Sequence, residues 1–225
     1  MKKTIVWLCL ALLGGVLEGA AQEGGLKGVV FLPQWLPQAQ FAGYYVAQER
    51  GFYRRRGLEV TILGGGPEMP VGPALEKGAA RFGTLLMASA IKARDRGVTL
   101  VNIAQLGQRS AMMLVAFKNR GIHHPQDLQG KKVGVWREEF LVQPRAFFRK
   151  YGLTVIEVPQ TGNMNLLLRG GVEAASAMWY NEYYQLTLAG VDPEELTTFL
   201  MADHGLDFPG DGLYCLESTY QEDPE

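Results

Sequence analysis

A short segment rich in aromatic and amide side chains follows the first apolar run of the mature part of the chain. Trp35 lies in this segment between Pro33 and Pro37, and the two prolines stiffen the backbone around the indole. A fixed indole stacks well on a planar ring, with about 0.5–1.5 kcal/mol beyond the buried area. Gln38 and Gln40 add amide donors and acceptors. The segment predicts a binding site for a flat polar molecule, and the alternative is that Trp35 is a core residue beneath a loop.

A second aromatic cluster follows another apolar run, residues 174–178. Trp179 and Tyr180 come first, and Glu182 falls in the first turn of the helix expected next. A carboxylate at this place accepts hydrogen bonds from ring or amino N–H groups, while an aromatic side chain covers the ring face. The alternative is that Glu182 only interacts with the helix dipole. The residue types leave both interpretations open.

Four further positions complete the predicted ligand-binding set, and they are Tyr44, Gln108, Trp136 and Asn163. Tyr44 lies on a helix predicted from Ala39 to Arg50, and Trp136 ends a predicted strand. Gln108 comes just before the expected crossing between two lobes, where it contacts either a ligand or only the other lobe. Asn163 is expected at a helix start, where free backbone N–H groups meet polar ligands, although simple capping is the commoner role.

The sequence offers little support for catalysis or metal binding. His123 and His124 are adjacent, a spacing that suits no common metal motif, and His204 stands alone elsewhere. A nucleophile elbow and a G-x-G-x-x-G pattern are both missing from the sequence. We therefore expect a protein that is not an enzyme, with no catalytic residues, no metal and no cofactor.

Strand-like and helix-like segments alternate along the chain, which predicts an α/β fold with parallel sheets covered by helices on both faces. The rhythm restarts at the apolar run Met112–Phe117, so we expect two α/β lobes with a ligand cleft between them. Lobe 1 is predicted at residues 22–115, lobe 2 at 116–208, and a return to lobe 1 at 209–225. Strands are predicted at 28–32, 58–63, 80–83, 98–104, 112–117, 133–136, 153–158, 174–178, 196–201 and 213–215. Thr84 is predicted to cap one helix, and another helix is predicted at 179–189.

The first 21 residues have the pattern of a secretory signal peptide. Lys2 and Lys3 precede the apolar run Ile5–Leu13, and small residues end at Ala21, where we expect cleavage. An uncleaved membrane anchor is the alternative, but the run is shorter than the roughly 20 apolar residues of a spanning helix. The mature protein would be exported to the periplasm or the cell surface, with Cys215 as its one cysteine and no internal disulfide.

The amino-acid composition and net charge of the chain argue against nucleic acid as a partner. The 225 residues carry 22 basic and 23 acidic side chains, a net charge of −1, and 47% of them are hydrophobic. This is the composition of a folded globular protein without a basic surface for nucleic acid. We expect a monomer that binds a small molecule and no nucleic acid.

Several motifs together resemble the NMT1/THI5-like (SsuA/THI5-like) family, whose members are mostly substrate-binding proteins of ABC importers. The matching segments are Trp35-x-Pro37-x-Ala39-x-Phe41-x-Gly43-Tyr44-Tyr45, Gly78-x-Ala80-x-Phe82-Gly83, Asp127-Leu128-x-Gly130-Lys131-Lys132 and Trp179-Tyr180-Asn181-Glu182. The resemblance implies a type II periplasmic-binding-protein fold that closes on its ligand, and an ABC permease as partner.

The resemblance also implies a heterocyclic ligand, either a thiamine pyrimidine precursor such as formylaminopyrimidine or, in a sister group, riboflavin. Trp35 matches the stacking position of the family, and Glu182 matches the acidic position that meets the aminopyrimidine edge. A carboxylate against an amidine-like edge can make a bidentate contact. Thiamine biosynthesis is the pathway that such a pyrimidine precursor would serve.

The chain departs from the pyrimidine-binding pattern at three positions. Gln38, Gln40 and Phe41 stand where those members have Asn, Asn and His, a version closer to the riboflavin branch. The return segment 209–225 is also shorter than in family members, which suits a fragment or the ligand-sensing domain of a membrane receptor. The fungal pyrimidine synthase of the same family uses pyridoxal phosphate and a cysteine-rich motif, which this chain lacks.

Overall fold

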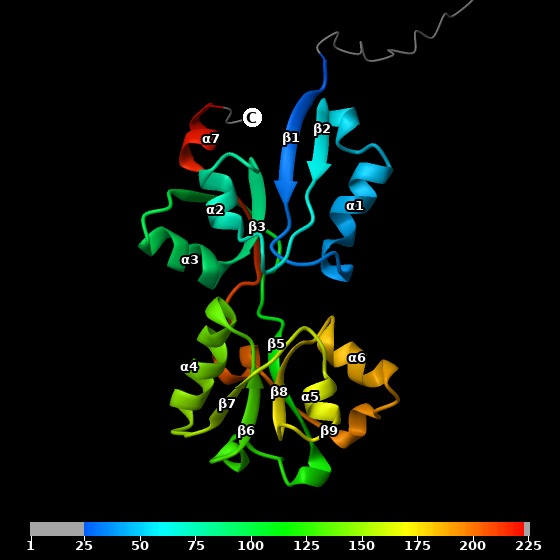
Figure 1. The fold of residues 1–225 in the computed structure, drawn as a ribbon, viewed down its shortest axis with the longest axis vertical. Coiled ribbons are helices and arrows are strands. Elements are labelled where there is room, and N and C mark those ends of the chain that lie inside the picture. Colours follow the sequence, from blue (N-terminus) through cyan, green and yellow to red (C-terminus); the bar gives the residue numbers. More distant parts are fainter. Residues whose placement is uncertain (1–24, 223–225) are drawn as a thin grey trace, which may run out of the picture.

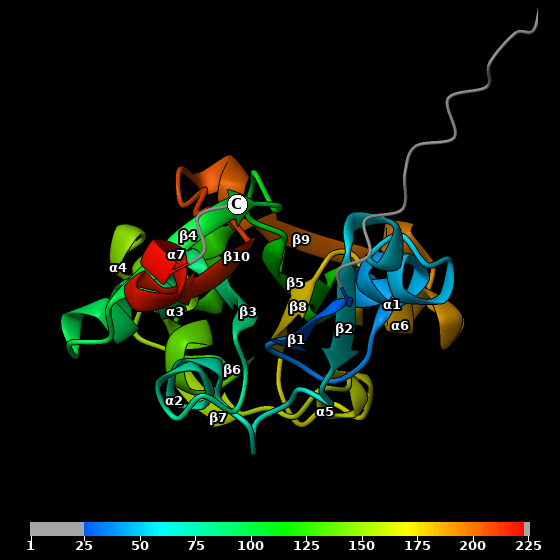
Figure 2. The same ribbon diagram turned by 90° about the horizontal axis from the view of Figure 1, so that it is seen from above.

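Two five-stranded sheets flanked by helices make up the part of the chain that the computed structural model describes, residues 25–222 (Figure 1). The predicted signal peptide, residues 1–21, lies outside the described residues. Figures 1 and 2 agree that α1 and α6 lie on one side of the molecule and α3 and α4 on the other. Within the described residues, every helix is too short or too polar to cross a membrane.

The first sheet belongs to lobe 1 and has the strand order β2-β1-β3-β10-β4. Strand β1 pairs in parallel with β2 and β3, whereas β10 runs antiparallel to both β3 and β4. The strands are β1 (Lys27–Leu32), β2 (Leu58–Ile62), β3 (Phe82–Leu86), β4 (Leu100–Gln105) and β10 (Asp211–Leu216), and the helices are α1 (Ala42–Glu49), α2 (Val71–Glu76), α3 (Met87–Asp95) and α7 (Glu217–Glu222).

The second sheet belongs to lobe 2 and repeats this plan with the order β7-β6-β8-β5-β9. Strand β6 is parallel to β7 and β8, and β5 is antiparallel to β8 and β9. The strands are β5 (Met112–Phe117), β6 (Lys132–Val135), β7 (Ile156–Pro159), β8 (Ala174–Met178) and β9 (Leu196–Leu200), and the helices are α4 (Val142–Lys150), α5 (Asn165–Leu168) and α6 (Glu182–Leu188). Short 3-10 helices lie at Ala39–Phe41, Arg54–Arg56, Lys118–Arg120, Pro125–Leu128, Glu138–Leu141, Pro193–Glu195 and Met201–His204.

The antiparallel strand of each sheet is the one that arrives from the other lobe. Strand β5 follows the connection 106–111 out of lobe 1, and β10 follows the connection 201–210 out of lobe 2. An arriving strand begins at the edge of the sheet that faces the other lobe, which is also the edge where the neighbouring parallel strands end. The register places Asp211 opposite Leu86 and Met112 opposite Met178. Residues from four strand ends therefore meet between the lobes.

Both faces of the central strands are buried, as expected for sheets covered by helices on each side. Along β5, Met112, Leu114 and Ala116 pack on the face of α4, whereas Met113 and Val115 pack on the opposite face with residues of α5 and α6. This alternation is the two-residue period of a strand. The continuous apolar run in the sequence thus reflects a strand that is buried on both faces.

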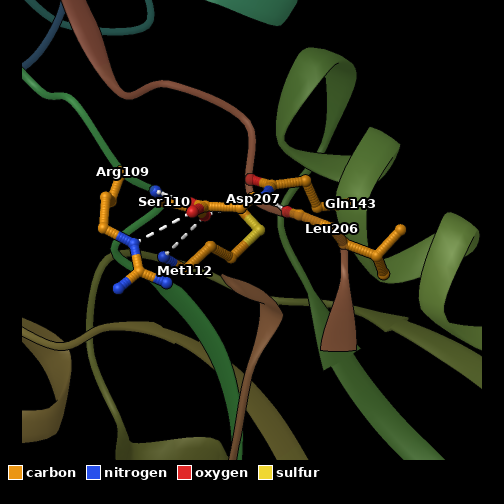
Figure 3. A network of polar contacts seen from close by, with 6 residues as sticks. All are labelled: Arg109, Ser110, Met112, Gln143, Leu206 and Asp207. Atoms are coloured by element: carbon orange, nitrogen blue, oxygen red, sulfur yellow. Dashed lines mark hydrogen bonds and ion pairs between the residues drawn. The ribbon is translucent and has the colours of Figure 1, made fainter. Parts of the chain in front are cut away.

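The two connections between the lobes are linked by a network of polar contacts (Figure 3). Asp207 accepts hydrogen bonds from Arg109 Nε at 2.9 Å and from the Ser110 backbone N–H at 2.8 Å. Gln143 of α4 donates to Ser110 Oγ and to the Leu206 carbonyl, both at 2.7 Å. One side chain of lobe 2 therefore holds both connections.

Several predicted elements are wrong in position or direction. The sheets are not wholly parallel, because β10 and β5 enter between or beside strands that run the other way. The strand predicted at 80–83 lies at Phe82–Leu86, and Thr84 is a buried strand residue whose hydroxyl accepts from the Gln34 N–H instead of capping a helix. The helix predicted from residue 179 begins only at Glu182, since residues 179–181 form the turn after β8.

Candidate functional site

A cavity of about 560 Å³ lies between the two lobes. Both sheets contribute to its walls through the strand ends and connections described above. Five of the predicted ligand-binding residues line it, namely Gln40, Tyr44, Gln108, Trp179 and Tyr180. Its volume falls in the range of pockets that hold a drug-sized ligand, roughly 300–1,000 Å³.

A second, smaller hollow of about 30 Å³ adjoins the cavity. Gln40, Leu86, Met178 and Tyr180 line both spaces, so the two are neighbours in the same cleft. The other lining residues of the small hollow include Trp35, Gln38, Trp136 and Glu182. A space of this size holds about one water molecule. Room for a ring is therefore found in the larger cavity, and the small hollow lies beside it.

Trp35 makes an aromatic contact across the cleft. Its ring meets Phe140 of lobe 2 edge to face, with 5.6 Å between ring centroids, and Phe140 meets Trp136 in the same way at 5.7 Å. Trp136 is largely buried and donates from Nε1 to the Thr161 carbonyl at 3.1 Å. The indole of Trp35 thus joins the two lobes in this structure, through a lobe 2 residue that the sequence did not single out.

Glu182 is buried, with 4% of its surface exposed, and its carboxylate accepts hydrogen bonds from within the protein. The Met178 backbone N–H donates to it at 3.0 Å, and Asn181 Nδ2 donates at 2.7 Å. Burial raises the pKa of Glu182, and these hydrogen bonds oppose the rise. The side chain ties the end of β8 to the start of α6 and so fixes the turn that carries Trp179 and Tyr180.

A second carboxylate of the cleft, Asp211, is half-buried and lies in the wall of the larger cavity. It is the first residue of β10 and accepts a hydrogen bond from Gln34 Nε2. Gln34 is held in turn, because its backbone N–H donates to Thr84 Oγ1 at 2.9 Å and its side-chain oxygen accepts from the Leu86 N–H at 2.9 Å. Burial raises the pKa of Asp211 to about 6, with the Gln34 hydrogen bond acting in the other direction.

Two buried polar atoms on residues of the cavity wall have no hydrogen-bond partner within the described residues. They are the Tyr44 hydroxyl and Gln40 Oε1, both on residues that line the cavity. Gln40 uses its Nε2 to donate to Gln38 Oε1 at 3.0 Å. Burial, and secondarily the charge of Asp211, raise the pKa of Tyr44 and of Tyr180, so both hydroxyls stay protonated. Orphaned buried groups of this kind are suited to hydrogen bonds with a bound molecule.

The remaining predicted residues differ in their placement. Asn163 is exposed and lines neither space, and its Oδ1 accepts from the Asn165 N–H at 3.0 Å in the turn just before the N-cap of α5, Met164. Gln108 is exposed at the cavity rim, and its Nε2 donates to the Gln105 carbonyl at 2.6 Å. Within the part of the chain that the structure describes, no group of three His, Cys, Asp or Glu side chains is placed to hold a metal.

Among the cleft residues that sequence reasoning missed are Gln34, Phe140, Gln143 and Asp211. Gln34 is next to Trp35 in the segment predicted to bind a ligand, so its position in the sequence could have indicated that it also lies in the cleft. Asp211 follows Pro209 and Gly210 at the point where the chain returns to lobe 1, and a charged residue at a lobe crossing was a second signal. Phe140 and Gln143 offered no signal of their own, because both occupy ordinary positions of an amphipathic helical segment.

The two lobes, their order of strands and the cleft between them define the fold of periplasmic binding proteins. The periplasmic aliphatic sulphonate binding protein SsuA from Escherichia coli has this fold, with a TM-score of 0.69 at 17% identity, covering 88% of this chain and 68% of that one. The predicted fold class is confirmed.

The chain belongs to the NMT1/THI5-like family, whose family model matches residues 38–225. The 4-amino-5-hydroxymethyl-2-methylpyrimidine phosphate synthase of Schizosaccharomyces pombe is 28% identical over 126 residues, which cover 56% of this chain and 36% of the synthase. The riboflavin-binding protein RibY of Chloroflexus aurantiacus is 26% identical over 215 residues, which cover 89% of this chain and 58% of RibY. The chain thus spans about a third of the synthase and somewhat over half of RibY.

We predict that Gly65 is needed to position the segment that carries Trp35. A Cβ at residue 65 would overlap the backbone carbonyl oxygens of Pro33 and Trp35, whereas a Cβ at Gly64 would have nothing within 4 Å. Gly65→Ala should therefore lower the free energy of unfolding by roughly 1–3 kcal/mol and change the near-ultraviolet circular dichroism of tryptophan. Gly64→Ala is the matched control and should stay within about 0.5 kcal/mol of the wild type. Equal behaviour of the two variants would contradict the prediction.

We predict that Asp211 makes the free energy of unfolding depend on pH in a specific direction. Its folded-state pKa of about 6 lies above the ordinary 3.8, so the native state holds the proton more tightly and the wild type gains stability as pH falls from 7 to 4. Asp211→Asn should lack this gain, so the difference in unfolding free energy between wild type and variant should change by roughly 1–3 kcal/mol over that range.

The matched comparison for this titration is Asp207→Asn. Hydrogen bonds from Ser110 and Arg109 lower the pKa of Asp207, so here the wild type should lose stability relative to the variant as pH falls. Urea unfolding at several pH values measures both differences. A difference between wild type and Asp211→Asn that stays constant from pH 7 to 4 would rule out the assigned burial of Asp211.

Proposed function

We propose that this chain is an exported, monomeric solute-binding protein that holds a planar nitrogen heterocycle between its lobes and delivers it to an ABC permease. The cavity of about 560 Å³ carries the proposal, because aromatic side chains reach it from both lobes. Tyr44 comes from lobe 1, and Trp179 and Tyr180 come from lobe 2. Walls of this kind suit a flat ring, and amide and carboxylate groups beside them suit its polar edge.

The first candidate ligand is a thiamine pyrimidine precursor such as formylaminopyrimidine. Relatives named as 4-amino-5-hydroxymethyl-2-methylpyrimidine phosphate synthases support it, because the product in their name contains the same aminopyrimidine ring. Asp211 supplies a carboxylate to the wall of the larger cavity, which Tyr180 also lines, and an aminopyrimidine offers N–H donors to match. Trp35 and Gln38 would border the narrow end of the same site.

The second candidate is riboflavin. The match to RibY extends over 89% of this chain, compared with 56% for the fungal synthase, and it includes both lobes. The size of the larger cavity also suits a ligand of more than one ring. Gln38 and Gln40, which replace the asparagines of pyrimidine binders, agree with this choice.

We place the chain with the binding proteins and not with the synthases of its family. Similarity to solved binding proteins supports this, as does the cysteine content: within the described residues Cys215 is the one cysteine, and it is buried. A role as the sensing domain of a membrane receptor would use the same cavity and the same ligand.

We predict that Tyr180→Ala will weaken ligand binding about 10- to 100-fold, because the ring lines both spaces of the cleft. Tyr184→Ala is the matched control, since Tyr184 lies four residues along on α6 and is exposed. Titration calorimetry with formylaminopyrimidine and with riboflavin measures the affinities, and mass spectrometry of the recovered ligand tests for turnover.

Saturable binding of one compound, returned unchanged, is the expected result. Conversion of the ligand would favour the enzymes of the family, and failure of both compounds to bind to folded wild-type protein would reject the proposed ligand class. A loss of affinity in Tyr184→Ala equal to that in Tyr180→Ala would move the site away from the cavity.

We predict that the full-length chain, expressed with its own N-terminus in a secreting bacterial host, will be exported and will begin at Gln22 after cleavage. N-terminal sequencing of the extracytoplasmic fraction measures this. Ala21→Arg should block cleavage, because the site needs small residues. Wild-type protein that stays in the membrane fraction with its N-terminus intact would instead support the anchor alternative.

A further inference from the structure

We infer that Asp211 selects the charge of the ligand by accepting hydrogen bonds from a protonated amine or amidinium group on the ring, and that it disfavours anions. This rests on the proposed function, because it takes the larger cavity as the ligand site. It goes further in assigning the recognising group to a residue outside the sequence motifs.

Asp211 is held firmly in the cavity wall. It begins a strand that pairs on both sides, and its carboxylate is held by Gln34, which is itself bound to Thr84 and Leu86 of β3. Sites built on strands and supported by a second set of hydrogen bonds place their groups more accurately than sites on free loops. A recognising carboxylate is effective when it is positioned before the ligand arrives.

Asp211 also has unused hydrogen-bonding capacity. An ionised carboxylate has about four acceptor sites, and among the described residues Gln34 is the one side chain that donates to it. Glu182 differs, because each of its oxygens already accepts from a donor of its own turn, Met178 N–H or Asn181 Nδ2. Of these two carboxylates in the cleft, Asp211 keeps the larger unused capacity, and it is the one that lines the larger cavity.

The charge balance of the cavity favours a cation. Its charged lining residues are Asp211 and Arg109, but Arg109 is paired with Asp207 at 2.9 Å and its side chain is 68% exposed. The other titratable groups near Asp211 are the tyrosines 44, 180 and 214, with Glu182 beyond Tyr180. A half-buried carboxylate loses part of its hydration, and a ligand cation would offset that cost. An anion would meet like charge in the same place.

Benzamidine and benzoate test this inference, since they share a ring and differ in the charge of one flat group. At pH 8, where Asp211 with its pKa of about 6 is ionised, wild-type protein should bind benzamidinium at least roughly 10-fold more tightly than benzoate. Asp211→Asn should reduce the affinity for benzamidinium roughly 10- to 100-fold. Asp203→Asn, which removes an exposed acid on the same connection, should behave as the wild type. Ligand-detected NMR titration measures these weak affinities.

Wild-type protein that binds neither probe, or prefers benzoate, would overturn the inference, as would Asp211→Asn with the preference intact. Asp211→Ser provides a second neutral variant if Asp211→Asn fails to unfold cooperatively.

The experiment distinguishes failure of this inference from failure of the proposed function. A benzamidinium preference that depends on Asp211, without binding of formylaminopyrimidine or riboflavin, rejects the proposed ligand class and keeps the inference. Binding of formylaminopyrimidine or riboflavin that is unchanged in Asp211→Asn keeps the proposed ligand class and rejects the inference.

Discussion

The structure depends on two chain connections that run side by side between the lobes. The Gly210 N–H donates to the Gly107 carbonyl at 2.8 Å, and the Leu106 and Gly107 N–H groups donate to the Asp211 carbonyl at 3.0 and 2.8 Å. The approach is so close that a Cβ on Gly107 would lie 2.9 Å from the Asp211 nitrogen. Because the connections are paired, the strands that follow them must both begin at the cleft, and the cavity is built at their first residues.

The same pairing indicates where the lobes can bend. Gln105 of β4 donates to the carbonyls of Gly107 and Gly210, which fixes these residues to lobe 1. Gln143 of α4 donates to Ser110 and Leu206, which fixes those ends to lobe 2. The segments left between these fixed ends are residues 108–109 and 207–209, and most of them line the cavity. Under the proposed function, a ligand in the cavity would contact the segments about which the lobes would close, so that closure and binding would be coupled.

Much of the fold could be predicted because buried strands leave apolar runs. The runs at Met112–Phe117 and Ala174–Met178 match strands residue for residue. The strand at Phe82–Leu86 was misplaced since Thr84 looks like a helix cap, and only the tertiary partner Gln34 explains its burial. The direction of β10 was harder to predict, because local periodicity carries no signal that this strand enters between β3 and β4. A charged residue at the lobe crossing pointed to Asp211, but it did not place the side chain in the cavity wall.

The family motifs single out Glu182 as the acidic residue of the site. In the structure, two acidic residues of the cleft, Glu182 and Asp211, have different roles. Glu182 is engaged by the backbone and by Asn181, so its first effect is on the shape of the turn that presents Trp179 and Tyr180. Asp211 comes from the opposite lobe and keeps acceptor sites toward the cavity. Tyr180 lies within the electrostatic influence of both carboxylates, with Asp211 the stronger. A ligand ring against Tyr180 would therefore meet one acid that shapes its binding surface and another that reads its charge, and the two roles are separable because they belong to different lobes.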